Sequence, residues 1–305
     1  MNRTLYTFKQ FLDEHFDVPV RKLSLHTRLG CPHRDSRTGE GGCIYCNESG
    51  FSNLNNQEHD IRSQITLGLS DAKNRGYQGK HIAYFQTGTN TCAEPELLEA
   101  WWRTVLEFPE EIVGLSISTR PDCLSDADMD ILSALSRELM VWVELGLQSA
   151  NDETLRRINR GHDVWTFQDA VHRLEAHPDL LVCAHIILGL PGESEEDMIH
   201  TIRTLNQTKI HGIKIHHLQV VRNTVLSDWY RNDQIDVMDE DSYIRLLTEI
   251  IPHIRPDMVI HRLFGDIHPT LLIAPKWPTP KPRVIQKIME TLEHQNLYQG
   301  KYYEK

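Results

Sequence analysis

Three cysteines in a short segment are the residues whose types and spacing most clearly indicate chemistry. Cys31, Cys43 and Cys46 follow the pattern C-x11-C-x2-C within GCPHRDSRTGEGGCIYC, a stretch with no helical or strand period. Thiolates are the usual ligands of iron-sulfur clusters, and three cysteines leave one iron of a four-iron cluster open to another ligand. The glycines of this loop would let its backbone turn tightly beside such a cluster.

Two other kinds of site fit the same residues. With His33 as a fourth ligand the cysteines could form a structural zinc site, and the C-x-x-C pair alone could act as a redox dithiol. Cys92, Cys123 and Cys183 have no partner spacing, and we interpret them as ordinary buried thiols. The triplet with its glycines favours a cluster, and the remaining chain has to support that choice.

Regular elements must position this loop, and the chain alternates between strand-like and helix-like patterns. Ser125 and Ser194 each precede an aspartate by three residues, as at capped helix starts. Alternating units predict parallel strands joined by right-handed crossovers, with functional residues just after the strands. The six predicted strands span residues 22–27, 81–86, 112–118, 140–147, 181–188 and 212–221.

The pattern changes after the sixth strand and so divides the chain. Two helical segments, 242–254 and 283–295, flank the proline-rich stretch IAPKWPTPKP. We therefore predict an α/β fold: a partial (β/α)6 TIM-like barrel with an N-terminal lead-in over residues 1–221, and a small C-terminal α/β extension over residues 222–305.

Composition limits the class of protein. A chain of 305 residues with 40% hydrophobic content can bury one large core. Its net charge of -11 argues against a broadly basic nucleic-acid surface. There is no apolar run of about 18 residues and no secretory pattern at the start, and clustered cysteines are typical of a reducing compartment. We expect a cytoplasmic protein that does not enter a membrane.

The cysteine triplet after the first strand of a βα barrel resembles the radical S-adenosylmethionine (SAM) superfamily, whose usual spacing is C-x3-C-x2-C. The longer spacing resembles the branch of the elongator catalytic subunit. It is more similar still to a small uncharacterised bacterial group with CP-x-RD and GGC-x-[FY]-C, which read CPHRD and GGCIYC here. The resemblance covers roughly residues 5–277. It implies a 4Fe-4S cluster on the three cysteines, reductive cleavage of SAM, and a 5'-deoxyadenosyl radical acting on an unidentified substrate.

The resemblance also implies contacts to SAM. Tyr45 matches an aromatic position that packs near the adenine, with a core aromatic as the plainer alternative. Gly88, in QTGTNT, is what remains of a Gly-Gly motif that binds the SAM amino group. Gln148 and Arg160 match a Gln and an Arg that contact SAM in the coproporphyrinogen-oxidase relatives. An arginine there could hold the methionine carboxylate with its planar fork, or it could form a surface ion pair.

Two positions depart from the family pattern. Ser118, in STRPD, replaces the glutamate of the elongator branch, so the contact that this carboxylate would make to SAM is in doubt. His185, in HIILGLPGE, stands where the family often has an aspartate that contacts ribose. A histidine with satisfied hydrogen bonds in the core is an equal alternative.

The resemblance assigns the barrel to the cluster and SAM, so we expect the C-terminal extension to form the substrate side of the cavity. Arg222, Arg262 and Asp266 lie near turn-like stretches, and we expect Arg222, directly after the sixth strand, to point toward the barrel mouth. An extension that only caps the barrel is the alternative. The implied partners are SAM, an electron donor of flavodoxin or ferredoxin type, and a substrate in the class of tRNA, protein or small metabolite. A zinc- or cluster-stabilised binding or electron-transfer protein on the same fold is the competing function.

Overall fold

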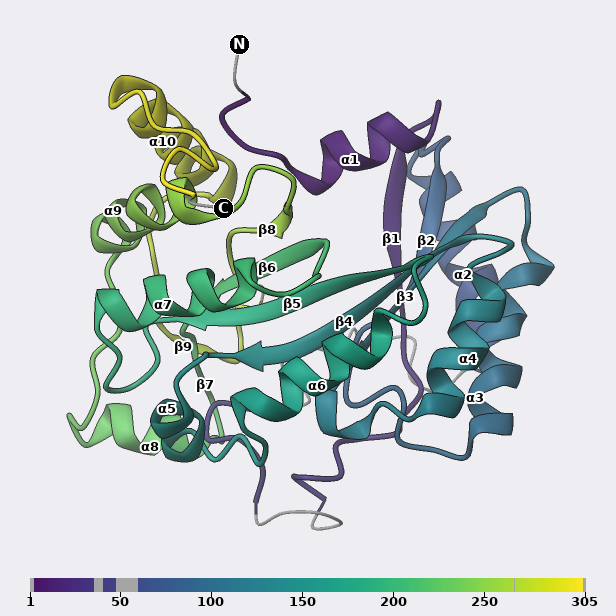
Figure 1. Cartoon of the computed structure of the whole chain (residues 1–305), viewed down its shortest axis with the longest axis horizontal. Coiled ribbons are helices and arrows are strands. Elements are labelled where there is room, and N and C mark those ends of the chain that lie inside the picture. Colours follow the sequence, from purple (N-terminus) through teal and green to yellow (C-terminus); the bar gives the residue numbers. More distant parts are fainter. Residues whose placement is uncertain (1–2, 36–40, 48–59, 266, 304–305) are drawn as a thin grey trace.

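The centre of the computed structural model is a seven-stranded sheet in which all neighbouring strands are parallel. The sheet curls into an open half-barrel, with helices packed on its outer side (Figure 1). The structure describes residues 3–35, 41–47, 60–265 and 267–303. In their order across the sheet the strands are β1 (Val20–Leu25), β2 (Lys80–Phe85), β3 (Ile112–Thr119), β4 (Met140–Gln148), β5 (Leu180–Leu188), β6 (Gly212–His217) and β8 (Val259–Arg262).

The connecting helices begin where the sequence provides caps. The side chains of Ser125 and Ser194 each accept a hydrogen bond from the aspartate N–H three residues on, and the aspartate carboxylate accepts one from the backbone N–H of the serine. These capping boxes confirm both predicted starts. No helix in the described ranges is long and apolar enough to cross a membrane. The connecting helices are α2 (Ile61–Asn74), α3 (Pro95–Arg103), η3 (Thr104–Glu107), η4 (Pro121–Cys123), α4 (Asp126–Leu135), α5 (Asp152–Arg157), α6 (Val164–Leu174) and α7 (Glu195–Asn206).

The two faces of the sheet differ, because successive side chains of a strand point to opposite sides. In β4, Val143 and its outward neighbours join the main core under the helices, whereas Trp142 and Glu144 point into the concave side. Helix α1 (Phe8–His15) fills the amino-terminal end of that concave side, and the rings of Phe11 and Trp142 meet edge-on with centroids 5.4 Å apart. The concave side is therefore closed at one end and accessible where the strands end.

The residues after β6 complete the sheet as well as extending it. β6 ends at His217, so the prediction of a strand through 221 is wrong beyond that residue; Val220–Val221 forms β7, antiparallel to β9 (Leu272–Ala274). The unpredicted β8 pairs with β6 as the seventh strand of a fold that is, as predicted, a partial TIM-like α/β barrel. The remaining helices are α8 (Val225–Arg231), α9 (Glu240–Ile250), η5 (Ile251–His253) and α10 (Lys281–His294). The predicted segment 242–254 matches α9 with η5, and the predicted segment 283–295 matches α10.

The segment before α1 runs beside β8. The backbone N–H of Ile260 donates to Tyr6 O at 2.8 Å, and Thr7 forms an isolated parallel bridge with Ile260. Gln299 holds the same segment, since its N–H donates to Thr4 O at 3.0 Å and its side-chain oxygen accepts from the Tyr6 N–H at 2.8 Å. Residues from the two ends of the described chain thus stabilise the β8 edge together.

Candidate metal and cofactor site

The three cysteines lie in the loop that follows β1, where short turns fix their backbone. The carbonyl oxygen of Cys31 accepts hydrogen bonds from the N–H groups of Arg34 at 3.0 Å and Asp35 at 2.8 Å, and Cys46 N–H donates to Cys43 O at 3.0 Å. Cys43 is buried and the other two are half-buried. Burial, and then the nearby Cys43, raise the pKa of the Cys46 thiol to about 12, so its thiolate requires a compensating positive charge such as that of iron.

A second loop, between α5 and α6, anchors the cysteine loop. The side-chain amide of Asn159 donates to Gly42 O at 2.8 Å, and the backbone N–H of Ile44 donates to Ile158 O at 3.0 Å. Gly42 and Ile44 flank Cys43 on its two sides. The loop between α5 and α6 therefore fixes the position of the middle cysteine.

Arg160 places a cation beside the thiols. Its Nη1 lies 3.7 Å from Cys43 Sγ, and its Nη2 donates to Gly146 O at 2.6 Å. The residue is 5% exposed, and its Nε has no hydrogen-bond partner in the described part of the chain. A buried guanidinium with an unpaired donor is suited to a carboxylate, which accepts two parallel hydrogen bonds from it.

The zinc alternative requires about four donors around one ion, at roughly 2.0–2.3 Å. Among the residues that the structure describes, no three Cys, His, Asp or Glu side chains are placed to hold a single ion. The Nε2 atom of His33, the fourth ligand in that alternative, lies 2.7 Å from Asn159 O. The thiolates of a four-iron cluster, by contrast, bind different irons.

The loop after β2 contacts the cysteine loop at Gly88. This residue has a φ of +79°, and a Cβ there would lie 2.5 Å from Gly30 O, which other residues could not accommodate without backbone movement. The N–H of Thr89 donates to the same oxygen at 2.8 Å. A glycine at the predicted position thus lets the two loops meet.

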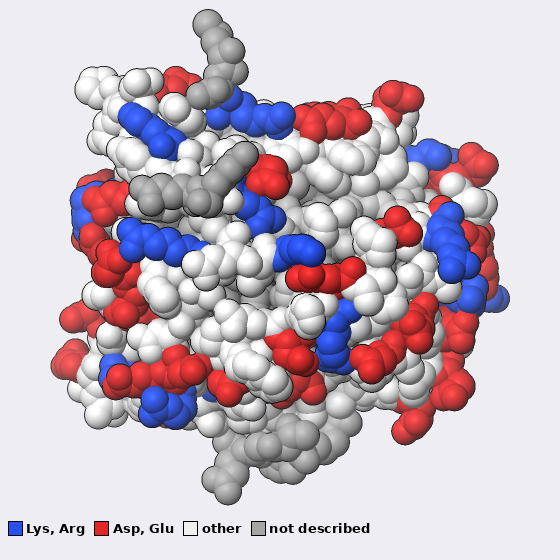
Figure 2. Space-filling view, viewed as in Figure 1, with Lys and Arg blue, Asp and Glu red and all other residues white. Residues whose placement is uncertain are grey.

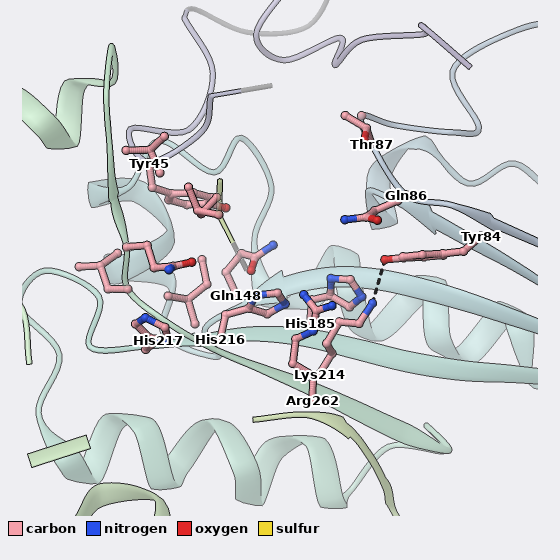
Figure 3. A pocket seen from close by; sticks show the side chains of 16 residues that line it. Tyr45, Tyr84, Gln86, Thr87, Gln148, His185, Lys214, His216, His217 and Arg262 are labelled. Carbon is pink, nitrogen blue, oxygen red and sulfur yellow. Dashed lines mark hydrogen bonds between the residues drawn. The ribbon is translucent and has the colours of Figure 1, made fainter. Parts of the chain in front are cut away.

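A cavity of about 190 Å³ lies where the strands end and these loops meet (Figure 3). Four of the predicted SAM contacts, Tyr45, Gly88, Gln148 and His185, line it, and so does Arg262. Arg160 and Ser118 do not line it. The other lining residues are Tyr84, Gln86, Thr87, Ile187, Lys214, His216, His217, Leu218, Gln219, Val221 and Ile267.

Gln148, the last residue of β4, reaches the cavity through a left-handed backbone. Its φ is +79°, and the pairing of β4 with β5 is irregular between Gly146 and Gln148. A Cβ on Gly146 would lie 2.7 Å from Gln148 Nε2 and 2.8 Å from Arg160 Nη2. The glycine therefore lets Gln148 and Arg160, which the family resemblance pairs, approach the same point.

Beneath the cavity, one buried carboxylate is surrounded by nitrogen groups. Glu144 is 1% exposed, forms ion pairs with Lys22 and Lys214, and lies 2.6 Å from His185 Nε2. Burial would raise the pKa of Glu144, but Lys214 and Lys22 outweigh it and hold that pKa well below its usual range. Burial, and then Lys214, lower the pKa of His185 to about 4, so its ring is neutral at pH 7.

Ser118 joins this buried network. Its hydroxyl shares a hydrogen bond with the Tyr84 hydroxyl at 2.9 Å and lies 3.4 Å from Glu144 Oε2, and Lys214 donates to the same tyrosine at 2.8 Å. The carboxylate of Glu144, on the neighbouring strand β4, thus lies next to Ser118, the position at which the elongator branch has a glutamate.

Four residues at or beneath the cavity were not predicted from the sequence: Tyr84, Glu144, Lys214 and His216. Each occupies an inward position of a strand, among apolar residues. Buried parallel strands are nearly continuous hydrophobic runs, so a Lys or Glu inside such a run was the sequence signal that could have indicated a functional residue. The strand order was needed to show that these side chains meet.

The residues predicted for the substrate do not lie together. Arg262 lines the cavity, but Arg222 is exposed, and its Nε donates to Thr270 O at 2.9 Å. Arg222 follows β7 and not the main-sheet strand that ends at His217, which explains the difference from the prediction. Asp266 lies outside the described residues.

Two family patterns match the chain: the radical SAM superfamily over residues 29–205 and the radical SAM C-terminal domain over residues 210–294. The uncharacterized protein YtqA of Bacillus subtilis is 36% identical over 305 residues, which cover 98% of this chain and 93% of YtqA. Protein YhcC of Escherichia coli is 35% identical over 267 residues, which cover 87% of this chain and 85% of YhcC.

Two further similarities concern a shorter part of the chain and the fold. The tRNA uridine(34) acetyltransferase of Dehalococcoides mccartyi is 28% identical over 165 residues, which cover 53% of this chain and 35% of that enzyme. The archaeal Methanocaldococcus infernus Elp3 structure has a TM-score of 0.72 at 19% identity, and the match covers 92% of this chain and 64% of Elp3. The second similarity shows a shared architecture.

Proposed function

The chain belongs to the radical SAM superfamily of enzymes, and we propose accordingly that it binds a four-iron four-sulfur cluster through Cys31, Cys43 and Cys46 and cleaves SAM beside it. The bound cluster and SAM supply an electron and a 5'-deoxyadenosyl radical that removes hydrogen from a substrate. The protein's own residues hold these groups in position and keep water from the cavity.

One observation carries this proposal: Tyr45 of the cysteine loop lines the same cavity as three other predicted SAM contacts, Gly88, Gln148 and His185. Tyr45 stands between Cys43 and Cys46 and lines the cavity together with Gln148. Arg160 joins the two parts, because its guanidinium touches Cys43 Sγ and approaches Gln148.

Each residue has a chemical role in the proposal. Arg160, buried and with an unpaired donor, would hold the carboxylate of SAM close to the cysteines. The Gln148 amide would bind polar atoms of SAM, and the loop at Gly88 would offer carbonyl oxygens to the amino group of SAM. Tyr45 would pack on the adenine, and the neutral His185 would contact the ribose.

The proposed activity is tested directly with anaerobically reconstituted protein. We expect brown protein with about four irons per chain that releases 5'-deoxyadenosine from SAM after reduction. Colourless protein with one tightly held zinc would instead support the binding-protein alternative. Brown protein that leaves SAM intact under reduction would support the electron-transfer alternative.

Two observations bear on the substrate class. Partial similarity to a tRNA-modifying enzyme favours RNA. The net charge of -11 favours a metabolite or protein, and on the face shown in Figure 2 basic and acidic residues are interspersed without a broad basic patch. Comparing tRNA nucleosides and metabolite levels with and without the gene would separate these classes. An electron donor of flavodoxin or ferredoxin type and a cytoplasmic location stay predictions.

A further inference from the structure

We propose that Arg262 and Lys214 bind a small anionic group of the substrate, a carboxylate or a phosphate, in the part of the cavity next to β6 and β8. This inference rests on the proposed function for its assumption that the substrate shares the cavity with SAM.

Arg262 is the first support. It is half-buried at the end of β8 and lines the cavity, and none of the described residues gives its guanidinium a carboxylate partner or a hydrogen bond. In Figure 3 it comes from below toward the same space as Lys214 and His185. A half-buried cation facing a cavity without a protein anion provides an attractive position for a ligand anion.

The charges around Arg262 are the second support. In the described part of the cavity and the network beneath it, the cations Lys22, Lys214 and Arg262 face the single carboxylate of Glu144. Burial, and then Arg262, hold the pKa of His216 well below its usual range, so this histidine leaves the positive excess unchanged at pH 7. The local excess of positive charge therefore favours an anion.

Position separates this anion from the carboxylate of SAM. Arg160 contacts Cys43 Sγ, whereas Arg262 and Lys214 come from β8 and β6 and lie apart from Tyr45 in Figure 3. One arginine is thus available beside the cysteines and another on the far side of the cavity. Two separate cations suit two separate anionic groups.

Charge favours a small molecule. The volume of about 190 Å³ belongs to the cavity that the proposed function also gives to SAM, so it does not select the substrate. The net charge of -11 and the interspersed charges on the face shown in Figure 2 favour a small anion over an RNA chain. We therefore assign the site to a small anionic metabolite.

The test uses inorganic phosphate and succinate as probes in titration calorimetry on the reconstituted full chain, with and without SAM. Arg262→Gln removes the charge and keeps a shorter side chain that can still form hydrogen bonds. Arg262→Lys keeps the charge without the fork. Arg231→Gln is the matched control, because Arg231 is an exposed arginine on α8, 3.0 Å from Asp228.

We expect wild type to bind at least one probe at one site per chain. Arg262→Gln should bind it about tenfold or more weakly, Arg262→Lys should lie between the two, and Arg231→Gln should match wild type. The SAM affinity of Arg262→Gln should change much less than its probe affinity.

Three results would overturn the inference: no binding of either probe to wild type, equal probe affinity in Arg262→Gln, or an equal loss of SAM affinity, which would assign the guanidinium to SAM. Displacement of bound phosphate by tRNA would move the assignment to RNA and also overturn it. SAM cleavage by wild type is measured in parallel. Probe binding without SAM cleavage would reject the proposed function alone, and SAM cleavage without probe binding would reject this inference alone.

Discussion

Among single residues, the cysteine thiols have the most specific expected role. We expect Cys31→Ala, Cys43→Ala and Cys46→Ala each to lose the cluster, because an iron would lack its ligand. Iron content and visible absorption after anaerobic reconstitution measure this. Cys183→Ala is the control, because Cys183 is buried in β5 among the hydrophobic residues around Trp142. This variant should keep its iron. Cys46→Ala with about four irons per chain would contradict the assignment.

Gln148 combines strain with function. A left-handed backbone costs a residue with a side chain about 1–2 kcal/mol, and glycine avoids that cost. Gln148→Gly should therefore be at least as stable as wild type to urea while binding SAM about tenfold more weakly, because the amide is lost.

Asn296→Gly provides the matched control for this prediction. Asn296 also has a positive φ, of 53°, but lies after α10 and outside the cavity. It should gain less stability than Gln148→Gly, because asparagine tolerates the left-handed region better than glutamine does, and it should keep its SAM affinity. A Gln148→Gly protein with unchanged SAM affinity would remove the side chain from the site.

At this scale, the sequence predicts the residues that belong to local motifs. Tyr45 and Gly88 are found from their place in a motif, and both line the cavity. Tyr84 and Lys214 have no motif and meet only through the pairing of distant strands. The positive side of the cavity therefore depends on topology that local sequence does not encode.

Among the elements, the end of β6 packs against the extension through a buried histidine. His217 is 6% exposed, and its ring stacks on Trp277 with centroids 4.4 Å apart. Burial, and then Lys281, lower the pKa of His217 from 6.5 to about 3. The unfolded chain therefore binds a proton on His217 more tightly than the folded chain does. Above about pH 6.5 the histidine is neutral in both states and does not affect the free energy of unfolding, which falls as the pH drops from about 6.5 toward 3.

Between about pH 7.5 and about pH 5, the free energy of unfolding should fall in both wild type and His217→Phe. We expect the fall to be about 2 kcal/mol larger in wild type. Phenylalanine keeps a ring against Trp277 but does not titrate. Urea denaturation at both pH values under anaerobic conditions measures the difference. His172→Asn, at an exposed position on α6, should behave as wild type does. Parallel pH dependence of wild type and His217→Phe would refute the explanation.

The elements themselves were predictable where a pattern is long and regular. All six predicted strands and the capped starts of α4 and α7 are found. β8 was missed because four residues, VIHR, are too short for a period and half polar. The sixth strand was extended too far because the apolar residues Val220 and Val221 continue its pattern while pairing with β9.

For the whole molecule, the shared sheet predicts that the proposed parts 1–221 and 222–305 do not fold separately. A chain of residues 1–221 would lack β8, so β6 would become an exposed edge strand. We expect it to aggregate, as measured by its soluble fraction and size-exclusion profile. Co-expression of residues 222–305 should restore soluble material. A monomeric 1–221 fragment with cooperative unfolding would show instead that the boundary separates folding units.

The pairing of Thr7 with Ile260 has a consequence for biosynthesis. A ribosome produces the segment before α1, which contains Thr7, long before β8, and at about 5–20 residues per second the delay is on the order of ten seconds or more. During that interval the cysteine loop after β1 already exists, while the edge of the sheet is unsealed. We therefore expect this edge of the sheet to stay open in the nascent chain until β8 has left the ribosome.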